Sequence, residues 1–104
     1  MIITNVEFVP NKTIVANLGL VTGSTVRAKN VVKDFGASMK NMFGGEIKSY
    51  TELLEEARKE ALERMVAQAT ALQANAIINV RFSTSAITEG AAEIYVYGTA
   101  VQIQ

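Results

Sequence analysis

Hydrophobic positions recur at helical spacing between residues 49 and 72, and this is the clearest periodic pattern in the chain. Apolar residues form one stripe, while charged residues occupy the opposite face. Ser49-Tyr50-Thr51-Glu52 fits a capping box, which predicts a helix that begins there and runs to about Leu72. The stripe consists of Leu54, Ala57, Ala61, Met65, Ala69 and Leu72, widened by Leu53, Leu62 and Val66. Its many alanines would let the helix approach a sheet closely.

The acidic face of this helix is most simply solvated. Glu55–Lys59 and Glu60–Arg64 are i,i+4 pairs in the favourable order. Glutamates in the opening turns also suit the positive N-terminal end of a helix. The charge run therefore gives no reason to expect a binding site.

A second, shorter helix is predicted over about residues 31–43. Asn30 is a suitable N-cap, and Gly44-Gly45 offers a left-handed stop without a Cβ penalty. The apolar residues at helical spacing are Val32, Phe35, Met39, Met42 and Phe43.

The N-terminal third of the chain favours extended structure. Residues 2–10 read as a short extended segment, followed by a turn at Pro10-Asn11-Lys12. Residues 13–29 are rich in β-branched side chains and are interrupted by Gly19 and Gly23. Glycine within a strand pattern marks a bulge or a close backbone approach. One long bent strand, or two strands around Gly23-Ser24, would both fit.

Two further strands are predicted at the C-terminal end, over residues 76–87 and 93–104, with a turn at 88–91. The alternation in the first places Ile78, Val80 and Phe82 on one face. In the second strand, neither face is polar. Such a strand is either central to a covered sheet or covered by a neighbouring subunit, and the small size of the chain favours the subunit. The two faces are Ile94, Val96, Gly98 and Ala100, and Tyr95, Tyr97, Thr99, Val101 and Ile103.

Composition indicates a single domain, residues 1–104, that assembles with other copies. Of its residues 49% are hydrophobic and only 19% are charged, and a short chain has limited interior in which to bury such a surplus. The formal net charge of zero, with scattered lysines, argues against nucleic-acid binding. No stretch approaches the ~20 apolar residues of a membrane-spanning helix. Because the N-terminus also lacks a signal-peptide pattern, we expect a cytoplasmic protein.

The chain contains no cysteine and no histidine. Disulfides, thiolate nucleophiles, and imidazole bases or ligands are therefore excluded, and we expect no enzymatic activity. Carboxylates remain as ligands for a divalent metal ion, the cofactor that such side chains could hold. The candidates outside the helical acidic face are Asp34, Glu46, Glu89 and Glu93. The simpler interpretation of each is an exposed surface acid. Met39, Met42 and Met65 fit core packing better than copper(I) coordination.

Five larger polar side chains are candidates for a pocket or an interface. They are Tyr50, Tyr95, Tyr97, Arg58 and Arg81. A half-buried tyrosine with a paired hydroxyl is common at interfaces, and an ion pair that ties the long helix to the sheet or to a neighbour would explain Arg58 without a ligand.

A series of short fragments in fixed order resembles the YbjQ-like family, small bacterial and archaeal proteins labelled as heavy-metal-binding. The fragments are Asn30-Val31-Val32-Lys33-Asp34-Phe35, Gly44-Gly45, Ala57-Arg58, Ala74-Asn75-Ala76 and Tyr97-Gly98-Thr99-Ala100-Val101. They span nearly the whole chain. The resemblance implies a dodecin-subunit-like α+β fold, in which a small antiparallel sheet packs on one long helix plus a shorter helix. It also implies a ring-shaped homopentamer in which neighbouring subunits continue one another's sheets.

The resemblance also marks the positions at which we expect structural or interface roles. These are Asn30, Gly44, Gly45, Arg58, Asn75, Tyr97, Gly98 and Thr99. Three departures from the family pattern affect the expectations. Gln73 stands where relatives usually have glycine, Lys33 replaces an arginine, and residues 79–84 lack the acidic residues often found there. If Gln73 is left-handed, it costs about 1 kcal/mol.

The sequence thus predicts a homo-oligomeric, non-enzymatic binding protein, with a pentamer favoured and a metal ion or small ligand at subunit junctions. The alternative is a structural ring that holds no ligand and presents a surface to a protein partner. A concave junction with converging carboxylates would favour the first, and a leftover exposed apolar patch the second.

Overall fold

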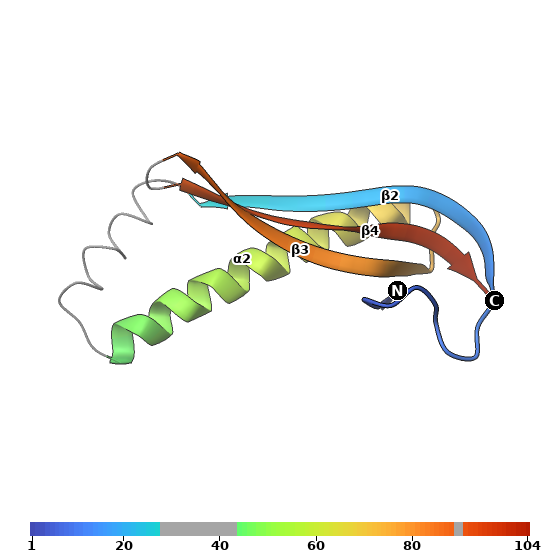
Figure 1. Ribbon diagram of the computed structural model, residues 1–104, viewed down its shortest axis with the longest axis horizontal. Coiled ribbons are helices and arrows are strands. Elements are labelled where there is room, and N and C mark those ends of the chain that lie inside the picture. The colour runs from blue at the N-terminus through green and yellow to red at the C-terminus, as the bar shows by residue number, and fades with distance from the viewer. Residues whose placement is uncertain (28–43, 89–90) are drawn as a thin grey trace.

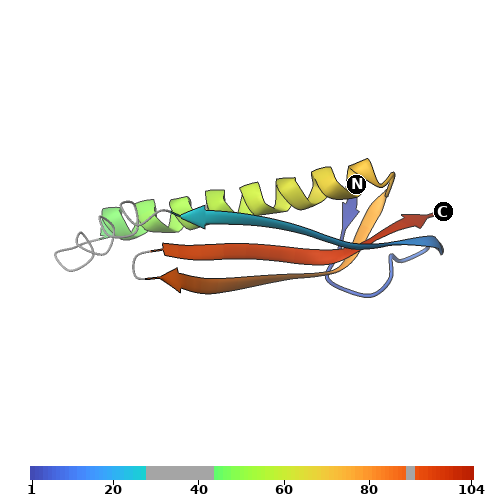
Figure 2. The same ribbon diagram turned by 90° about the horizontal axis from the view of Figure 1, so that it is seen from above.

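The computed structural model describes residues 1–27, 44–88 and 91–104 and has an α+β architecture. Its elements are β1 (Ile2–Ile3), β2 (Ile14–Arg27), α2 (Gly44–Ala71), β3 (Ala76–Thr88) and β4 (Ala91–Ile103). The four strands form one sheet in the order β1-β3-β4-β2, and α2 runs along one face of it (Figures 1 and 2). The predicted helix over 31–43 and its cap Asn30 lie outside the described residues.

The sheet is mixed, which corrects the expectation of a purely antiparallel one. The three long strands are antiparallel neighbours, but β1 pairs with β3 in parallel, with Ile2 opposite Ala76. The chain leaves β1 for β2 at the opposite edge of the sheet, so β1 is not part of a hairpin. Residues 14–27 form one long strand, the first of the two alternatives considered for this segment.

β4 lies between β3 and β2 within this one chain. Most of its apolar side chains are therefore covered within one chain, an explanation that we did not favour from the sequence, whereas Tyr97 is 36% exposed. Ile94, Val96 and Ala100 pack under α2, whereas Val101 and Ile103 belong to a second cluster on the other face. This second cluster is closed by Val9 of the N-terminal segment, residues 1–13. A neighbouring subunit is not needed to cover these positions.

The long helix begins five residues earlier than its capping-box pattern predicted. Gly44 and Gly45 are the first residues of α2, which corrects their assignment as a left-handed stop. Residues 46–48 contain no helix breaker, and a glycine within a helix costs only about 1 kcal/mol relative to alanine. The helix therefore extends through Ser49 instead of starting there.

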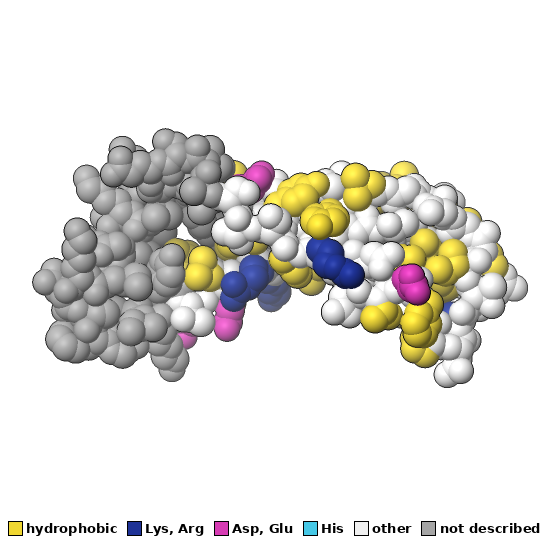
Figure 3. Space-filling model, viewed as in Figure 1, with side chains coloured by type: hydrophobic (Ala, Val, Ile, Leu, Met, Phe, Trp, Pro, Cys, Tyr) yellow, Lys and Arg dark blue, Asp and Glu magenta, His cyan; other side chains and the backbone are white. Residues whose placement is uncertain are grey.

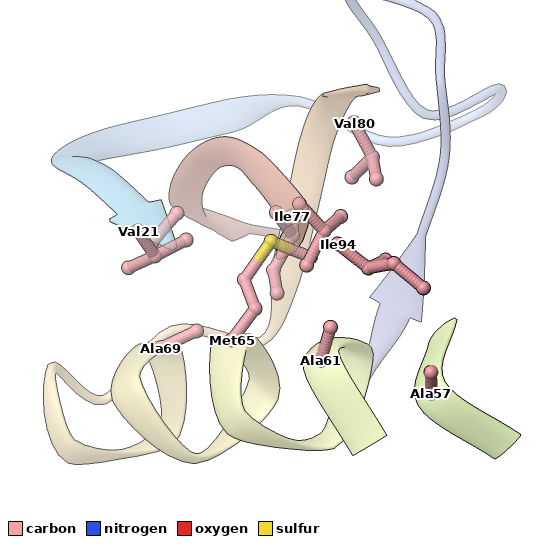
Figure 4. Packing of buried hydrophobic residues seen from close by; sticks show 10 residues of the cluster. Val21, Ala57, Ala61, Met65, Ala69, Ile77, Val80 and Ile94 are labelled. Atoms are coloured by element: carbon pink, nitrogen blue, oxygen red, sulfur yellow. The ribbon is translucent and has the colours of Figure 1, made fainter. Parts of the chain in front are cut away.

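The buried stripe of α2 agrees with the prediction over most of its length. Ala57, Ala61, Met65 and Ala69 are fully buried, and Leu54, Leu62 and Val66 pack beside them. Figure 4 shows Met65 reaching from α2 toward Ile77 and Ile94 of the sheet. Leu72 is 42% exposed, contrary to the prediction, because α2 ends at Ala71 and the chain turns away there.

The C-terminus of α2 is closed by a Schellman motif centred on Gln73. The Gln73 N–H donates to the Thr70 carbonyl at 2.9 Å, and the Ala74 N–H donates to the Ala69 carbonyl at 3.1 Å. Gln73 has a φ of 67°, which confirms that this position is left-handed. A glycine would adopt this conformation without a Cβ penalty.

The two β2 glycines play the two roles expected of glycine in a strand. Gly19, with a φ of 101°, sits at a register shift between β2 and β4. Gly23 marks the closest approach of helix and sheet. A Cβ at this position would lie 2.0 Å from the Ala61 carbonyl oxygen and 2.7 Å from the Met65 nitrogen. α2 can pack this closely because β2 has no side chain there.

A bulge in β3 changes which residues share a face. Asn79 has a φ of 54°, and the β3–β4 register shifts between Ile78 and Arg81. Ile78 therefore joins the cluster on the far face, while Val80 packs under α2. The expectation that Ile78, Val80 and Phe82 share one face is therefore wrong at Ile78, and Phe82 is 48% exposed.

Candidate functional site

The predicted carboxylate ligands are only partly within the described structure. Glu93 is half-buried in β4, opposite Val26 of β2 and Ser85 of β3. Glu46 lies near the start of α2, and its side chain is outside the described part, as are Asp34 and Glu89. The start of α2 lies at the same end of the molecule as the β3–β4 connection (Figures 1 and 2). The fold thus brings Glu46 and Glu93 to one end.

Over residues 1–27, 44–88 and 91–104, no three acidic side chains gather in a way that could hold a metal ion. A metal site built within one subunit therefore has no support from the described residues. Carboxylates brought together by several copies stay a prediction.

Asn75 joins the end of α2 to the end of β4. Its Nδ2 donates to the Ile103 carbonyl at 2.9 Å, and its Oδ1 accepts from the Ile103 N–H at 2.7 Å. The Asn75 N–H also donates to the Val101 carbonyl. An asparagine side chain can match a peptide group in both directions, so the role seen here is structural and lies within one chain.

Gly98 lies in β4 where the bulged strand β3 presses against it. An added Cβ would lie 2.7 Å from Ile77 Cγ2 and 3.1 Å from both the Ile78 oxygen and Val80 Cγ2. From the sequence we expected a structural or interface role at Gly98, which a Gly98→Val variant would disturb. The structure places the crowding inside the chain, so this variant would first disturb the β3–β4 pairing.

Tyr97 and Thr99 lie on the β4 face that points away from α2. Tyr97 is 36% exposed, and its ring centroid lies 5.6 Å from that of Tyr95. Thr99 is half-buried between Ile78 and Leu20 on the neighbouring strands. Tyr50 lies within α2, with its side chain outside the described part. Arg58 is exposed on α2 and forms no ion pair with another described residue.

Two side chains of α2 bond the outer edge of β2, a feature that the sequence analysis missed. Gln68 Oε1 accepts from the Thr22 N–H at 2.8 Å, and Arg64 donates to the Ser24 carbonyl at 2.5 Å. Arg64 also pairs with Glu60, as predicted, whereas the Glu55–Lys59 pair is not formed within the described helix. The sequence pattern that could have indicated these contacts is the i,i+4 spacing of Arg64 and Gln68 beside the alanine stripe. Unpaired edge groups invite other strands, and these two contacts occupy some of them.

A pocket of about 310 Å³ opens between the N-terminal segment and the β3 bulge. It is lined by Asn5, Val6, Glu7, Phe8, Asn79 and Arg81. Arg81 was a candidate from the sequence, but its partner Asn5 lies 76 positions away along the chain. Only the pairing of the N-terminal segment with β3 brings them together.

Large hydrophobic side chains remain exposed on the sheet and on the N-terminal segment. Figure 3 shows hydrophobic side chains gathered over the strands and again over the N-terminal segment. Those described as exposed are Met1, Ile2, Ile3, Val6, Phe8, Ile14, Val15, Leu20, Val26, Leu72, Phe82 and Tyr97. Among the described residues, no helix has the length and hydropathy needed to cross a bilayer.

Comparison with known proteins gives a consistent result over the full length. Residues 1–104 match the YbjQ family, described as "Putative heavy-metal-binding". A UPF0145 protein of Hahella chejuensis is 62% identical over the whole of both chains. A UPF0145 protein of Archaeoglobus fulgidus is 53% identical over all of this chain and 96% of the relative.

Among solved structures, a protein of unknown function from Pediococcus pentosaceus, assigned to the DUF74 family, has a similar fold. Its crystal structure aligns with a TM-score of 0.62 and 18% identity, covering all of this chain and 98% of the other. At this identity the likeness concerns the fold alone.

Proposed function

The chain belongs to the YbjQ family of UPF0145 proteins, and from this premise we propose that it is a non-enzymatic binding protein that works as a homo-oligomer. A pentameric ring is the assembly favoured by the sequence resemblance. The ligand, a metal ion or a small molecule, would bind where subunits meet.

The observation that carries the proposal is the amount of apolar surface that one chain leaves uncovered. Leu20 is 67% exposed, and Val26 and Tyr97 lie on the same face of the sheet, the one turned away from α2. Large exposed apolar patches are typical of interaction sites. A second copy is the partner always available at matching concentration, and closed homo-oligomers are the commonest assemblies.

The shape of the chain supports the same conclusion. Its Cα radius of gyration is 16.8 Å, against about 13 Å for a compact domain of this length. Its extents are 53 × 25 × 17 Å, as in a plate one helix and one sheet thick (Figures 1 and 2). A thin plate exposes much of its apolar surface, and packing against neighbours would reduce that exposure.

The outer edge of β3 is a suitable place for a neighbour to pair. Within the described part of the chain, β1 pairs only with Ala76 and Ile77, and the backbone of the N-terminal segment bonds the β3 backbone only as far as Val80. Among the described residues, Phe82 to Ser85 have no partner strand on that side. Strand addition from another subunit would satisfy these backbone groups.

The description of the family supports metal as the ligand class, and the sequence restricts which metals are plausible. Without cysteine or histidine, oxygen ligands would favour a hard divalent ion. The described part of one chain holds no cluster of three acids, and the proposal is that carboxylates from more than one subunit form the site.

The alternative is a ring that holds no ligand and presents a surface to a protein partner. Exposed Phe8 and Phe82, at 54% and 48%, favour this alternative if they stay uncovered after assembly.

A native mass spectrum of untagged protein, purified without chelators, tests the proposal and separates the two forms of it. A multiple of 11.2 kDa with a fixed excess mass supports the binding protein. A bare multiple supports the structural ring. A monomer at micromolar concentration contradicts both. The tag must be removed, because a His-tag would itself bind metal.

A further inference from the structure

The pocket beside the β3 bulge is preformed by backbone hydrogen bonds. The Asn79 N–H donates to the Val6 carbonyl at 2.9 Å, and the Val80 N–H donates to the Thr4 carbonyl at 3.1 Å. The bulge turns the backbone of Asn79 toward the N-terminal segment and holds that segment against β3. A site with a fixed backbone costs a ligand little ordering free energy.

Arg81 is held in place at one end of its guanidinium group. Its Nη1 donates to the Asn5 carbonyl at 2.6 Å and to the Val80 carbonyl at 3.0 Å. Among the described residues, Nε and Nη2 have no acceptor. These two nitrogens form the edge of arginine that binds a carboxylate through two parallel hydrogen bonds. The group is thus oriented and still has this edge available.

Glu7 contributes the opposite charge to the same pocket without neutralising Arg81. The two residues line one space, yet their charged atoms are not within ion-pair distance. Figure 3 shows one basic side chain over β3 and one acidic side chain over the N-terminal segment, set apart from each other. The surface between the two is free of charged side chains.

The remaining wall adds apolar and amide groups. Val6 and Phe8 line the pocket and are 42% and 54% exposed, and Asn79 belongs to the same lining. A pocket with one cation, one separate anion and an apolar rim matches a small zwitterion better than a simple anion, because Glu7 would repel a bare carboxylate.

We propose that this pocket binds a small apolar α-amino acid. Arg81 receives the carboxylate on its Nε–Nη2 edge, Glu7 receives the ammonium group, and Val6 and Phe8 contact the side chain. The site lies within one subunit, so it goes beyond the proposed function and does not depend on assembly or on a metal.

Titration of the full chain with L-phenylalanine, followed by amide chemical shifts, tests the proposal. The expected result is saturable shifts at residues 6–8 and 79–81, with a Kd on the order of 1 mM for a ligand of this size in an open pocket. 3-Phenylpropionate, which lacks the ammonium group, and phenethylamine, which lacks the carboxylate, should each bind at least about tenfold more weakly.

Variants that remove one charge at a time test the roles of Arg81 and Glu7 in binding. Arg81→Gln should weaken phenylalanine binding at least about tenfold, while Arg58→Gln, which removes the same charge from the exposed face of α2, should leave it unchanged. Glu7→Gln should likewise weaken phenylalanine binding, whereas Glu56→Gln, which removes the same charge from the exposed face of α2, should leave it unchanged. Wild-type binding by Arg81→Gln would overturn the proposal, as would the absence of saturable shifts at residues 6–8 and 79–81. Equal binding of phenylalanine and 3-phenylpropionate would show that the site takes simple anions and would overturn the zwitterion assignment.

Discussion

At the scale of single residues, Gly23 sets how closely helix and sheet can pack. The atoms that an added Cβ would meet are the Ala61 carbonyl oxygen and the Met65 nitrogen, both in the backbone of α2. Backbone atoms within a helix cannot rotate away as a side chain can. Val21 and Met65 lie in the same fully buried cluster, so any movement of α2 would open the core around them.

We therefore predict that Gly23→Ala lowers the free energy of unfolding by about 3 kcal/mol or more, since overpacking against a rigid neighbour forces the layers apart. Urea denaturation measures the change. Ser24→Ala, one residue along the same strand, is the control and should stay within about 0.5 kcal/mol of wild type. A Gly23→Ala protein as stable as this control would contradict the packing described here.

At Gln73 the informative substitution introduces a glycine instead of removing one, because a non-glycine residue occupies a left-handed position there. Gln73→Gly should raise the free energy of unfolding by about 1 kcal/mol through relief of the Cβ clash. Gln73→Ala keeps a Cβ and should bring no gain. Thermal unfolding of wild type and the two variants measures their relative stability. A Gln73→Gly protein less stable than the Gln73→Ala protein would contradict the prediction.

At the scale of elements, α2 protects the edge of β2 as well as covering a face of the sheet. Gln68 bonds the Thr22 N–H and Arg64 bonds the Ser24 carbonyl, both on the side of β2 that faces away from β4. The edge of β3 beyond Arg81 has no such contacts among the described residues. Side chains of α2 therefore protect the outer edge of β2, whereas the outer edge of β3 is available for pairing with another strand.

Gln68→Ala should expose the Thr22 amide to solvent while leaving the fold intact. We expect several-fold faster hydrogen exchange at Thr22 and a loss of about 1 kcal/mol, the usual net contribution of one hydrogen bond. Glu63→Ala, on the exposed face of the same helix, is the control and should leave the Thr22 rate unchanged. Equal Thr22 exchange rates in both variants would mean that Gln68 does not protect this edge.

The elements themselves could largely be predicted from the sequence, because their signals are local. The alanine stripe from Ala57 to Ala69 and the alternation of β4 follow directly from side-chain periodicity. The face of Ile78 could not be predicted, because it depends on one left-handed residue, Asn79, that shifts the register by one position. The helix start was misplaced because a capping pattern can occur inside a helix that other residues extend.

The candidate site was less predictable, since its residues meet only through tertiary pairing. Arg81 could be singled out by type, but Asn5 and Glu7 carry no pattern that links them to it. The pairing of the N-terminal segment with β3 depends on backbone hydrogen bonds, which do not require particular side chains and so cannot be recognised in the sequence.

At the scale of the whole molecule, one chain is a thin plate that leaves large apolar side chains exposed on one face of its sheet. Leu20, Val26 and Tyr97 lie on the face turned away from α2, and the N-terminal segment covers only the part of this face around Val101 and Ile103. A compact monomer would bury such positions, and an oligomer buries them between copies.

Leu20→Lys tests whether this face is the one that neighbours cover. Leu20 is 67% exposed in a single chain, so the substitution should hardly affect the fold of the subunit. A charge buried between copies would weaken assembly, and we expect a lower average mass in light scattering at the same concentration. Ala67→Lys adds the same charge on the exposed surface of α2 and should leave the mass unchanged. Equal masses for the two variants would place the interface elsewhere.

The most direct test of assembly itself is sedimentation equilibrium of the untagged wild-type protein over a range of concentrations. We predict a mass that is a fixed multiple of 11.2 kDa, with a pentamer favoured, and that persists at micromolar concentration. A mass of one chain at every concentration would contradict the account, because Leu20, Val26 and Tyr97 would then remain exposed to water.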